Sequence, residues 1–560
     1  MQKSKLFWSL FFLILASQIY SQVENVPLSH PVYSFLKEMQ VKRIIDNIND
    51  DNPNLSRFEV REFLTEIDSS SSQLSSTELK LLNRYNIEFY DNEICDANTW
   101  QAFGSKQCPE NENHLSFFEK PKYLYVYQGK GANLYLELIG HIYGGQSFKP
   151  QKNASILYDG GLRIRGTVFD HLGYYFTYDK GIITGSKTFA SVLEPKIKTS
   201  FKYVEDIEGY GNYEFVNGYL KFYAEPIKDM HLSIQLGREQ IKYGYGYGSR
   251  LVLSGDNPDM DFLKMNFHYG IISFSSIHAS TVGEFNFDRS KNYTKYFAAN
   301  KVKFSFKNLF DVGIGESIIY SGRGIDLGYL NPFAFYKIVE MSLQDRDNGT
   351  LFVDMQTHFL ENLELQGTFF LDENILFNLN ELDKYINKTA YQVGAFWYEA
   401  FGISNLSLIF EYTKIRPYVY SHYTVNNNYS AFGTNLGHRI GPNADEIYSK
   451  LSYNINEWIR INIEYEKVRS GENEINSNGL LIKNVGGDMF QGHRDGIDSD
   501  EAQFLDGIKI NNDIFTFNIR LEPIRDLIFD LTYRHNFENN LSTNVRSENN
   551  FAFMKMTVEF

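Results

Sequence analysis

Two stretches of the sequence bring tyrosines and basic residues together. In the first stretch, three tyrosines at alternate positions lie between two arginines; in the second, an arginine precedes two tyrosines, and a His–Arg pair follows. A tyrosine ring can pack on the apolar face of a pyranose, and a guanidinium can form paired hydrogen bonds with sugar hydroxyls or carboxylates. These residue types predict a sugar-binding site. The candidate contact residues are Arg238, Tyr243, Tyr245, Tyr247, Arg250, Arg416, Tyr418, Tyr420, His438 and Arg439.

The same residues have a structural interpretation. Tyrosines form girdles where a membrane barrel meets water, and arginines pair with carboxylates inside such barrels. Sequence alone leaves both interpretations open.

A cluster of acidic residues offers different chemistry. Asp495, Asp498, Asp500 and Glu501 could hold a divalent cation that bridges sugar or phosphate groups. Their spacing departs from the EF-hand pattern, and a solvated acidic loop is the alternative. We therefore expect no metal site and no cofactor.

Catalytic motifs are missing from the sequence. It contains no Gly-x-Ser-x-Gly elbow, His-Glu-x-x-His pair or phosphate-binding glycine loop, and its 12 histidines are scattered. Two cysteines exclude a multi-cysteine metal centre. We expect a non-catalytic protein, although a hydrolase whose catalytic triad comes from separate strands stays an alternative.

The first 21 residues have the layout of a secretory signal peptide. Lys3 and Lys5 precede an apolar run over 6–16 that only Ser9 interrupts, and small and polar residues follow up to Ser21. This run is too short to cross a hydrocarbon layer that needs about 20 residues. We predict cleavage after Ser21, which assigns residues 1–21 to the signal peptide, and export beyond the inner membrane.

Export places the two cysteines in an oxidising compartment. Cys95 and Cys108 are therefore a candidate disulfide, with two free thiols as the alternative.

Residues 22–90 show helical periodicity. An apolar stripe over 32–39 follows Ser29, which we expect to cap the first helix. Two capping boxes, Ser56 with Glu59 and Ser75 with Glu78, precede two further stripes. The sequence predicts a small periplasmic α-helical module with its linker over residues 22–120.

From about residue 121 the period changes to two. In segment 458–466, isoleucines alternate with Arg460, Asn462 and Glu464. Charge on one face of strand after strand does not suit a dry sandwich core, because unpaired buried charge is costly. An apolar outside around a polar inside is typical of a transmembrane β-barrel. The same alternation occupies residues 406–413, 515–521 and 527–534. In the C-terminal segment 552–560 it is clean from Met554 onward, since Phe553 lies on the polar face, and the segment ends in an aromatic residue on its apolar face.

Connections alternate between tight turns and long loops. Outer-membrane barrels have short turns on one rim and long loops on the outward rim. At roughly 24 residues per strand with its share of loop, residues 121–560 predict an all-β barrel of about 18 antiparallel strands, with sixteen as the alternative. Tight joins are expected at 225–230, 455–457 and 522–526, and long loops at 414–446, 468–513 and 536–550.

Composition agrees with this interpretation. Aromatic residues make up 16% of the chain, and the formal charge is −15. A net negative charge excludes nucleic acid as the main partner and opposes a strongly acidic glycan unless arginines cluster locally.

Several short segments resemble Wzi-like capsule-assembly outer-membrane proteins. They follow one another along nearly the whole chain in the order expected for that family. The matching segments are LSHPVYSFL (28–36), LSRFEV (55–60), GREQ (237–240), YGYGSRLVLS (245–254), YLNPF (329–333), DRDN (345–348), RPYVY (416–420), LGH (436–438) and GPNADE (441–446).

The resemblance implies an 18-stranded outer-membrane barrel with a periplasmic helical module. It also implies a lectin-like role that retains extracellular polysaccharide at the surface of a Gram-negative cell. Outer-membrane lipid and a periplasmic protein bound by the helical module are the other partners we expect.

Other functions stay open as alternatives. An uptake channel would conduct ions. A secretion-accessory barrel that lacks residues 22–120 would still insert into the membrane but would lose its function. A faint similarity of residues 55–64 to surface-layer homology helices would instead indicate contact with a cell-wall polymer.

Overall fold

The structure is a computed structural model of the chain. It describes residues 22–90, 98–100, 118–206, 211–284, 289–344, 346–372 and 383–560. The predicted signal peptide and the predicted Cys95–Cys108 disulfide lie outside these residues.

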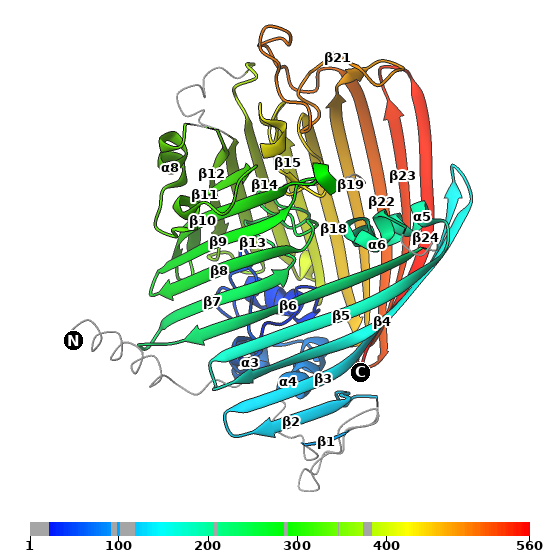
Figure 1. The fold of residues 1–560 in the computed structure, drawn as a ribbon. Helices are drawn as coiled ribbons and strands as arrows, with labels where there is room; N and C mark the ends of the chain where they lie inside the picture. Colours follow the sequence, from blue (N-terminus) through cyan, green and yellow to red (C-terminus); the bar gives the residue numbers. More distant parts are fainter. Residues whose placement is uncertain are drawn as a thin grey trace, which may run out of the picture.

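Eighteen antiparallel strands of the described chain close into a ring (Figure 1). Each strand pairs with its neighbour along the chain, and the last strand, β24, pairs with the first, β3. The predicted fold class is confirmed. The strands are β3 (Ala132–Lys149), β4 (Asn153–Val168), β5 (Leu172–Gly185), β6 (Asn212–Ala224), β7 (Met230–Glu239), β8 (Met260–Tyr269), β9 (Ile272–Val282), β10 (Thr294–Phe306), β11 (Phe310–Ser321), β12 (Asn348–Thr357), β13 (Leu363–Asp372), β14 (Thr389–Tyr398), β15 (Leu406–Ile415), β18 (Ala444–Asn456), β19 (Ile459–Glu472), β22 (Ile508–Ile524), β23 (Leu527–Asn540) and β24 (Val545–Glu559).

Smaller elements accompany this ring. β1 pairs with β2, and β2 pairs with the first residues of β3, so a short ribbon extends the wall at the lower end of Figure 1. The short strands are β1 (Thr99–Trp100), β2 (Tyr125–Gly129), β16 (Ser430–Ala431), β17 (Thr434–Asn435), β20 (Glu474–Ile475) and β21 (Leu481–Lys483). The helices are α2 (Val32–Val41), α3 (Arg57–Ser69), η1 (Ser71–Gln73), α4 (Ser76–Phe89), α5 (Lys187–Leu193), η3 (Pro195–Thr199), α6 (Phe201–Val204), η5 (Arg289–Lys291), α7 (Leu327–Leu330), α8 (Tyr336–Ser342), η6 (Ala400–Gly402) and η7 (Val425–Asn427).

The two faces of the wall follow the predicted alternation. Ile463, Phe517 and Leu531 are exposed on the outside. Arg460 and Asp530, on two of the same strands, line the interior. Because successive side chains of a strand point to opposite faces, the register fixes which residues meet the lumen. In the described chain, no helix has the length and apolar character needed to cross a membrane.

The connections divide into a short-turn rim and a long-loop rim. The tight joins near 225–230, 455–457 and 522–526 are confirmed, as are long loops over 416–443 and 473–507. The long loop predicted over 536–550 is wrong, because β23 and β24 continue through it and leave only 541–544 as a turn. Polar side chains do not interrupt backbone pairing, so these two strands extend beyond the apolar part of the wall.

The N-terminal helices form as predicted, and both capping boxes are present. The prediction that Ser29 caps the first helix is wrong. Helix α2 begins after Pro31, and the Val32 amide donates to Nδ1 of His30 at 3.1 Å. The histidine ring therefore satisfies the amide that the Ser29 hydroxyl was expected to satisfy.

Residues 22–90 fill the lumen at the short-turn end, and we call them the N-terminal plug. The apolar stripe of α2 packs with Phe396 and Tyr398 of β14. The Asn362 amide, in the turn between β12 and β13, donates to the Val41 carbonyl at 3.0 Å. Figure 1 shows α3 and α4 at the end of the barrel where the C-terminus lies.

A buried ion cluster fixes this plug to the wall. Asp51 accepts from Lys301 and from Lys303 of β10, each at 2.7 Å, and Lys301 also contacts Asp354 of β12 at 2.6 Å. All four side chains are buried. Such a cluster is tolerated because each charge faces an opposite one.

Two long loops fill the lumen from the other end. Within loops 240–259 and 416–443, Tyr420 donates to the Leu251 carbonyl at 2.8 Å. The Gly244 amide donates to the carbonyl of Asp51 at 2.8 Å, so loop 240–259 and the N-terminal plug meet inside the barrel.

Replacing Asp51 by alanine should loosen the plug. The change removes the carboxylate that two buried ammonium groups share, and we expect a loss of about 3–5 kcal/mol in the free energy of unfolding. Urea titration and protease cleavage within residues 22–90 measure the effect. Asp46→Ala is the matched control, because Asp46 pairs with Lys307 at 2.8 Å on the surface, where an ion pair contributes little. Equal stability of the two variants would contradict this role of Asp51.

Candidate functional site

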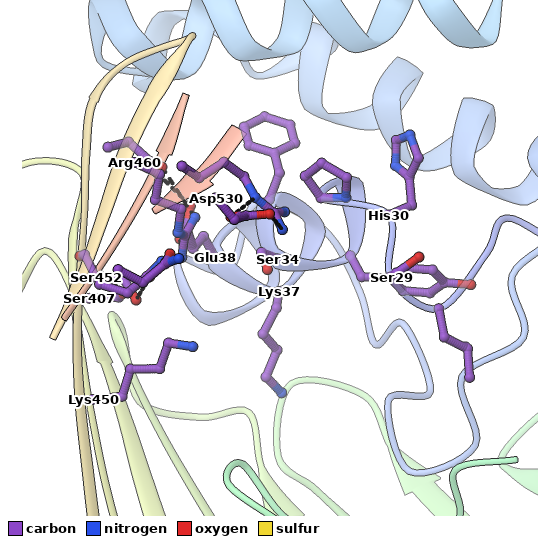
Figure 2. A pocket seen from close by; sticks show the side chains of 18 of the residues that line it. Ser29, His30, Ser34, Lys37, Glu38, Ser407, Lys450, Ser452, Arg460 and Asp530 are labelled. Carbon is purple, nitrogen blue, oxygen red and sulfur yellow. Dashed lines mark hydrogen bonds and ion pairs between the residues drawn. The ribbon is translucent and has the colours of Figure 1, made fainter. Parts of the chain in front are cut away.

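A cavity of about 710 Å³ remains inside the barrel between the N-terminal plug and one side of the wall. Strands β18, β19, β22, β23 and β24 form that side, and loop 240–259 reaches it from the long-loop end. Figure 2 shows Arg460 of the wall close to Glu38 of α2, with Lys450 further along the same wall. This volume lies within the range of ligand-binding pockets.

The alternation of the strands supplies the cavity wall. Every second residue of a strand points inward, so each strand contributes one polar row. Among the inward residues that line the cavity are Lys450, Ser452 and Asn454 of β18, Arg460, Asn462 and Glu464 of β19, Asn518, Arg520 and Glu522 of β22, Asp530 and Thr532 of β23, and Phe553 and Lys555 of β24.

Most charges of the cavity are paired. Arg460 lies 3.0 Å from Glu38 of the plug. Arg520 pairs with Asp530 of the neighbouring strand at 2.9 Å. Pairs of this kind hold the strands to one another and to the plug, and they leave their carboxylates unavailable to other cations. Lys450 and Glu464 form a further pair at 2.8 Å.

Three cations of the cavity have no carboxylate contact among the described residues. Nη2 of Arg250 donates to the carbonyl of Asp50 at 2.9 Å, while its Nη1 is buried without a partner. Lys242 and Lys555 line the cavity, and the Lys555 ammonium lies 5.0 Å from the centre of the Tyr143 ring. Because a half-buried cation without a carboxylate contact is only partly solvated, these groups favour an anionic or strongly polar ligand.

Electrostatics in the cavity differ from those of the chain as a whole. Burial, together with the charges of Arg250 and Lys450, lowers the pKa of the Lys242 ammonium. Burial also lowers the pKa of Arg250. Eight Lys or Arg residues line the cavity against seven Asp or Glu residues, so the negative balance of the chain does not extend into it.

Two of the ten predicted sugar-contact residues line this cavity. Tyr247 donates to Glu364 at 2.8 Å, and its amide donates to Glu411 at 2.8 Å, which fixes the ring at the cavity. Arg250 lies three residues later on the same loop.

Five of the predicted residues are buried among other protein groups. Tyr243 shares a hydrogen bond of 2.5 Å with Ser275, and Tyr245 donates to Asp311 at 3.4 Å. Burial lowers the pKa of His438 well below its usual value, and the charge of Arg439 adds to this effect. In this arrangement the buried residues support the loops. They are Tyr243, Tyr245, Tyr418, Tyr420 and His438.

Loop 416–443 holds two of these tyrosines in an unusual backbone conformation. Tyr418 has φ +64° and Tyr420 has φ +70°, in the left-handed region that bulky residues rarely adopt. Hydrogen bonds from Tyr418 to the Asn484 carbonyl at 3.2 Å and from Tyr420 to Leu251 offset that strain. The position of each ring is therefore set by the fold around it.

The remaining three predicted residues lie outside the cavity. Arg238 is on the outward face of β7 and pairs with Asp261 at 2.9 Å. Arg416 follows β15, and its Nε donates to the Asn387 carbonyl at 3.1 Å while one of its terminal nitrogens is buried without a partner. Arg439 pairs with Glu446 at 2.9 Å and stays partly exposed. Contact of these residues with a sugar stays a prediction.

The acidic cluster does not come together as a metal site. Asp498 accepts from Arg494 at 2.6 Å, whereas Asp495 and Asp500 are largely exposed. Burial opposes ionisation of Asp498, but hydrogen bonds from Arg494 and Asn484 lower its pKa overall. In the part of the chain that the structure describes, no group of three or more His, Cys, Asp or Glu residues could hold a metal ion.

Sequence reasoning missed Lys242, Lys450 and Lys555 as site residues. The last two occupy inward positions of alternating strands, so the alternation indicates that they face the lumen. Lys242 precedes the tyrosine run in a loop without periodicity, and only the path of that loop shows that it reaches the cavity.

Comparisons with known proteins agree with this fold. The family model described as capsule assembly protein Wzi matches residues 126–546. A search of curated proteins found no match.

Solved barrels are similar at low sequence identity. Wzi of Escherichia coli, an outer-membrane protein involved in group 1 capsule assembly and a carbohydrate-binding β-barrel, is 12% identical with a TM-score of 0.56; the match covers 96% of this chain and 99% of that one. OccK8 (OprE) of Pseudomonas aeruginosa is 8% identical with a TM-score of 0.44, covering 76% and 98%. OpdK of the same organism is 8% identical with a TM-score of 0.43, covering 76% and 98%.

The electrostatic coupling of Lys242 and Arg250 can be measured directly. Only a neutral amine is acylated, so a lowered pKa makes Lys242 reactive at a lower pH than an ordinary lysine. Removing the neighbouring guanidinium in Arg250→Gln should raise the pKa of Lys242 and move its labelling profile to higher pH. Mass spectrometry of the peptide that contains Lys242, after acylation at a series of pH values, follows this shift. Arg238→Gln is the control, since that guanidinium lies on the outer face; an unchanged profile in Arg250→Gln would contradict the coupling.

Proposed function

The chain belongs to the Wzi family of capsule assembly proteins, and from this premise we propose that it binds capsular polysaccharide and retains it at the cell surface. The observation that carries the proposal is the family match over residues 126–546, which extends from the start of the barrel to its last strand. The role is binding and retention rather than catalysis.

The barrel lies in the outer membrane with its long-loop rim outward. Its outer face is apolar along strand after strand, as a lipid-facing surface requires, and its backbone groups pair around a closed ring. With this orientation the N-terminal plug faces the periplasm, and loops 240–259 and 416–443 face the polysaccharide.

The polysaccharide contacts are strongest where Arg250 and Lys242 line the cavity. Arg250 and Lys242 supply cations that make no carboxylate contact among the described residues, and Tyr247 supplies an aromatic ring. This combination suits a sugar residue that carries a carboxylate or another anionic group. Arg416 and Arg439, on the outer loops, provide further contacts along the polymer.

The filled lumen disfavours an uptake channel as the second function. The N-terminal plug and loop 240–259 meet in the lumen through the hydrogen bond between Gly244 and Asp51. The buried ion cluster around Lys301 anchors the plug on one side of the barrel. An open pore would require both segments to leave their buried positions.

Removing the two cavity cations should weaken polysaccharide binding. A charge-assisted hydrogen bond contributes about 1.5–3 kcal/mol, so the double variant Lys242→Gln with Arg250→Gln should lose roughly tenfold or more in affinity. Calorimetric titration of the purified barrel with capsular polysaccharide from the same bacterium measures the loss.

Two further variants complete this experiment. Lys307→Gln is the matched control, because its ammonium lies in the turn between β10 and β11 at the short-turn rim, where it pairs with Asp46, and it should bind like the unaltered protein. Arg416→Gln tests the outer loop separately. Full affinity in the double variant would remove the cavity from the proposed binding site.

A further inference from the structure

The connection between β11 and β12 folds back over the outside of the barrel. It contains α7 and α8, and we call residues 325–342 the α7–α8 segment. The Asn300 side chain of β10 donates to the Ala334 carbonyl at 3.2 Å, and the carboxylate of Glu316 of β11 accepts from the Tyr336 amide at 2.9 Å. Figure 1 shows α8 beside β11 and β12, at the periphery of the barrel.

The residues under this segment are on the outward face of the wall. In β10, Lys301 and Phe297 point into the lumen, where they contact Asp51 and the interior apolar cluster. Asn300 and Ala298 alternate with them and therefore point outward. Both are nevertheless buried, because the α7–α8 segment covers them.

The covered patch is too polar for direct contact with lipid. One row of paired residues across β9, β10 and β11 consists of Ser276, Asn300 and Glu316. A carboxylate or amide that faces hydrocarbon without a hydrogen-bond partner is costly. The backbone of the α7–α8 segment supplies those partners through Ala334 and Tyr336.

The outer face of the α7–α8 segment is apolar. Of its eight exposed residues, six are large and hydrophobic. Its charged residues are paired: Lys337 lies 2.8 Å from Glu340, and Asp326 lies 3.5 Å from Arg323. The exposed hydrophobic residues are Ile325, Leu327, Phe333, Phe335, Ile338 and Met341.

This apolar face continues the hydrophobic surface of the wall. Phe333 stacks on Phe274 of β9, with ring centroids 6.0 Å apart and planes 11° apart. Phe274 belongs to an outward row that runs through Val302, Ile314 and Val353 on successive strands. Ile314 and Val353 are exposed there. The row and the segment therefore meet at the Phe333–Phe274 stack, which joins their apolar surfaces.

We propose that the α7–α8 segment is a lipid-contacting element, whose exposed apolar residues lie against the hydrocarbon of the outer leaflet and complete the hydrophobic band of the barrel. Its occupant is lipid because the segment hydrogen-bonds to the wall on one face and continues the wall's lipid-facing surface on the other. The inference rests on the outer-membrane placement proposed above.

Nitroxide labels in vesicles of dioleoylphosphatidylcholine test this inference. Oxygen concentrates in hydrocarbon, whereas a nickel chelate stays in water, so the ratio of their collision rates with the label reports its environment. Ile338→Cys is the test position at 66% exposure, and Ile482→Cys on β21 is the matched control at 63% exposure on a long loop. Val353→Cys is the reference for the lipid-facing wall. Each is labelled in a chain with Cys95→Ser and Cys108→Ser.

The ratio of the oxygen collision rate to the nickel-chelate collision rate should be above one at positions 338 and 353 and below one at position 482. A ratio below one at 338 with a ratio above one at 353 would overturn the inference while leaving the membrane placement intact. A label at 338 that neither reagent reaches would also overturn it, because a protein or a second copy of the chain would then cover the segment. A ratio below one at 353 would contradict the membrane placement itself.

A tryptophan version keeps the test independent of the cysteine substitutions. The tryptophan fluorescence of Ile338→Trp should be quenched by lipids brominated in their acyl chains, and that of Ile482→Trp by aqueous iodide. Each effect is measured as the loss of fluorescence relative to the loss in the unaltered chain. Quenching of both variants by iodide alone would overturn the inference.

Discussion

Closure of the strand ring is the constraint on which the rest of this structure depends. In hydrocarbon every backbone amide and carbonyl needs a partner, and the pairing of β24 with β3 removes the last free edges. A ring of this size encloses more space than inward side chains alone can fill. The molecule fills that space with chain: the N-terminal plug from the short-turn end, and loops 240–259 and 416–443 from the other end.

Filling a polar lumen with polypeptide requires matching charges. The inward rows of the strands carry lysine, arginine and carboxylate groups, and the plug supplies partners such as Asp51 for Lys301. The matching is incomplete beside β18–β24, where Arg250 and Lys242 line the remaining cavity without a described carboxylate partner. Similar matching occurs outside the barrel, where the α7–α8 segment supplies partners for the outward-facing Glu316. The connection thus covers Glu316, whereas Arg250 and Lys242 are left facing a space that a ligand can enter.

Local pattern was enough to predict the barrel and the helices, because alternation and capping depend on neighbouring residues. Arg460 and Glu464 were assigned to the lumen from their spacing alone, and both capping boxes form as predicted. The candidate site was predicted less completely, because burial of a loop tyrosine depends on residues far away in the sequence. Tyr247 lines the cavity while Tyr243, four residues earlier, is enclosed near Ser275, and nothing in their spacing separates the two. The lumenal position of the N-terminal helices likewise depends on long-range ion pairs between the plug and β10.

Retention of polysaccharide is the central claim, and it is tested most directly in cells. The measurement is the ratio of cell-bound to released surface polysaccharide in a strain that lacks this protein and in the same strain after complementation. The account predicts that polymer moves from the cells into the medium in the deletion strain while total synthesis stays unchanged, and that complementation restores the ratio. An unchanged ratio with normal synthesis would contradict it.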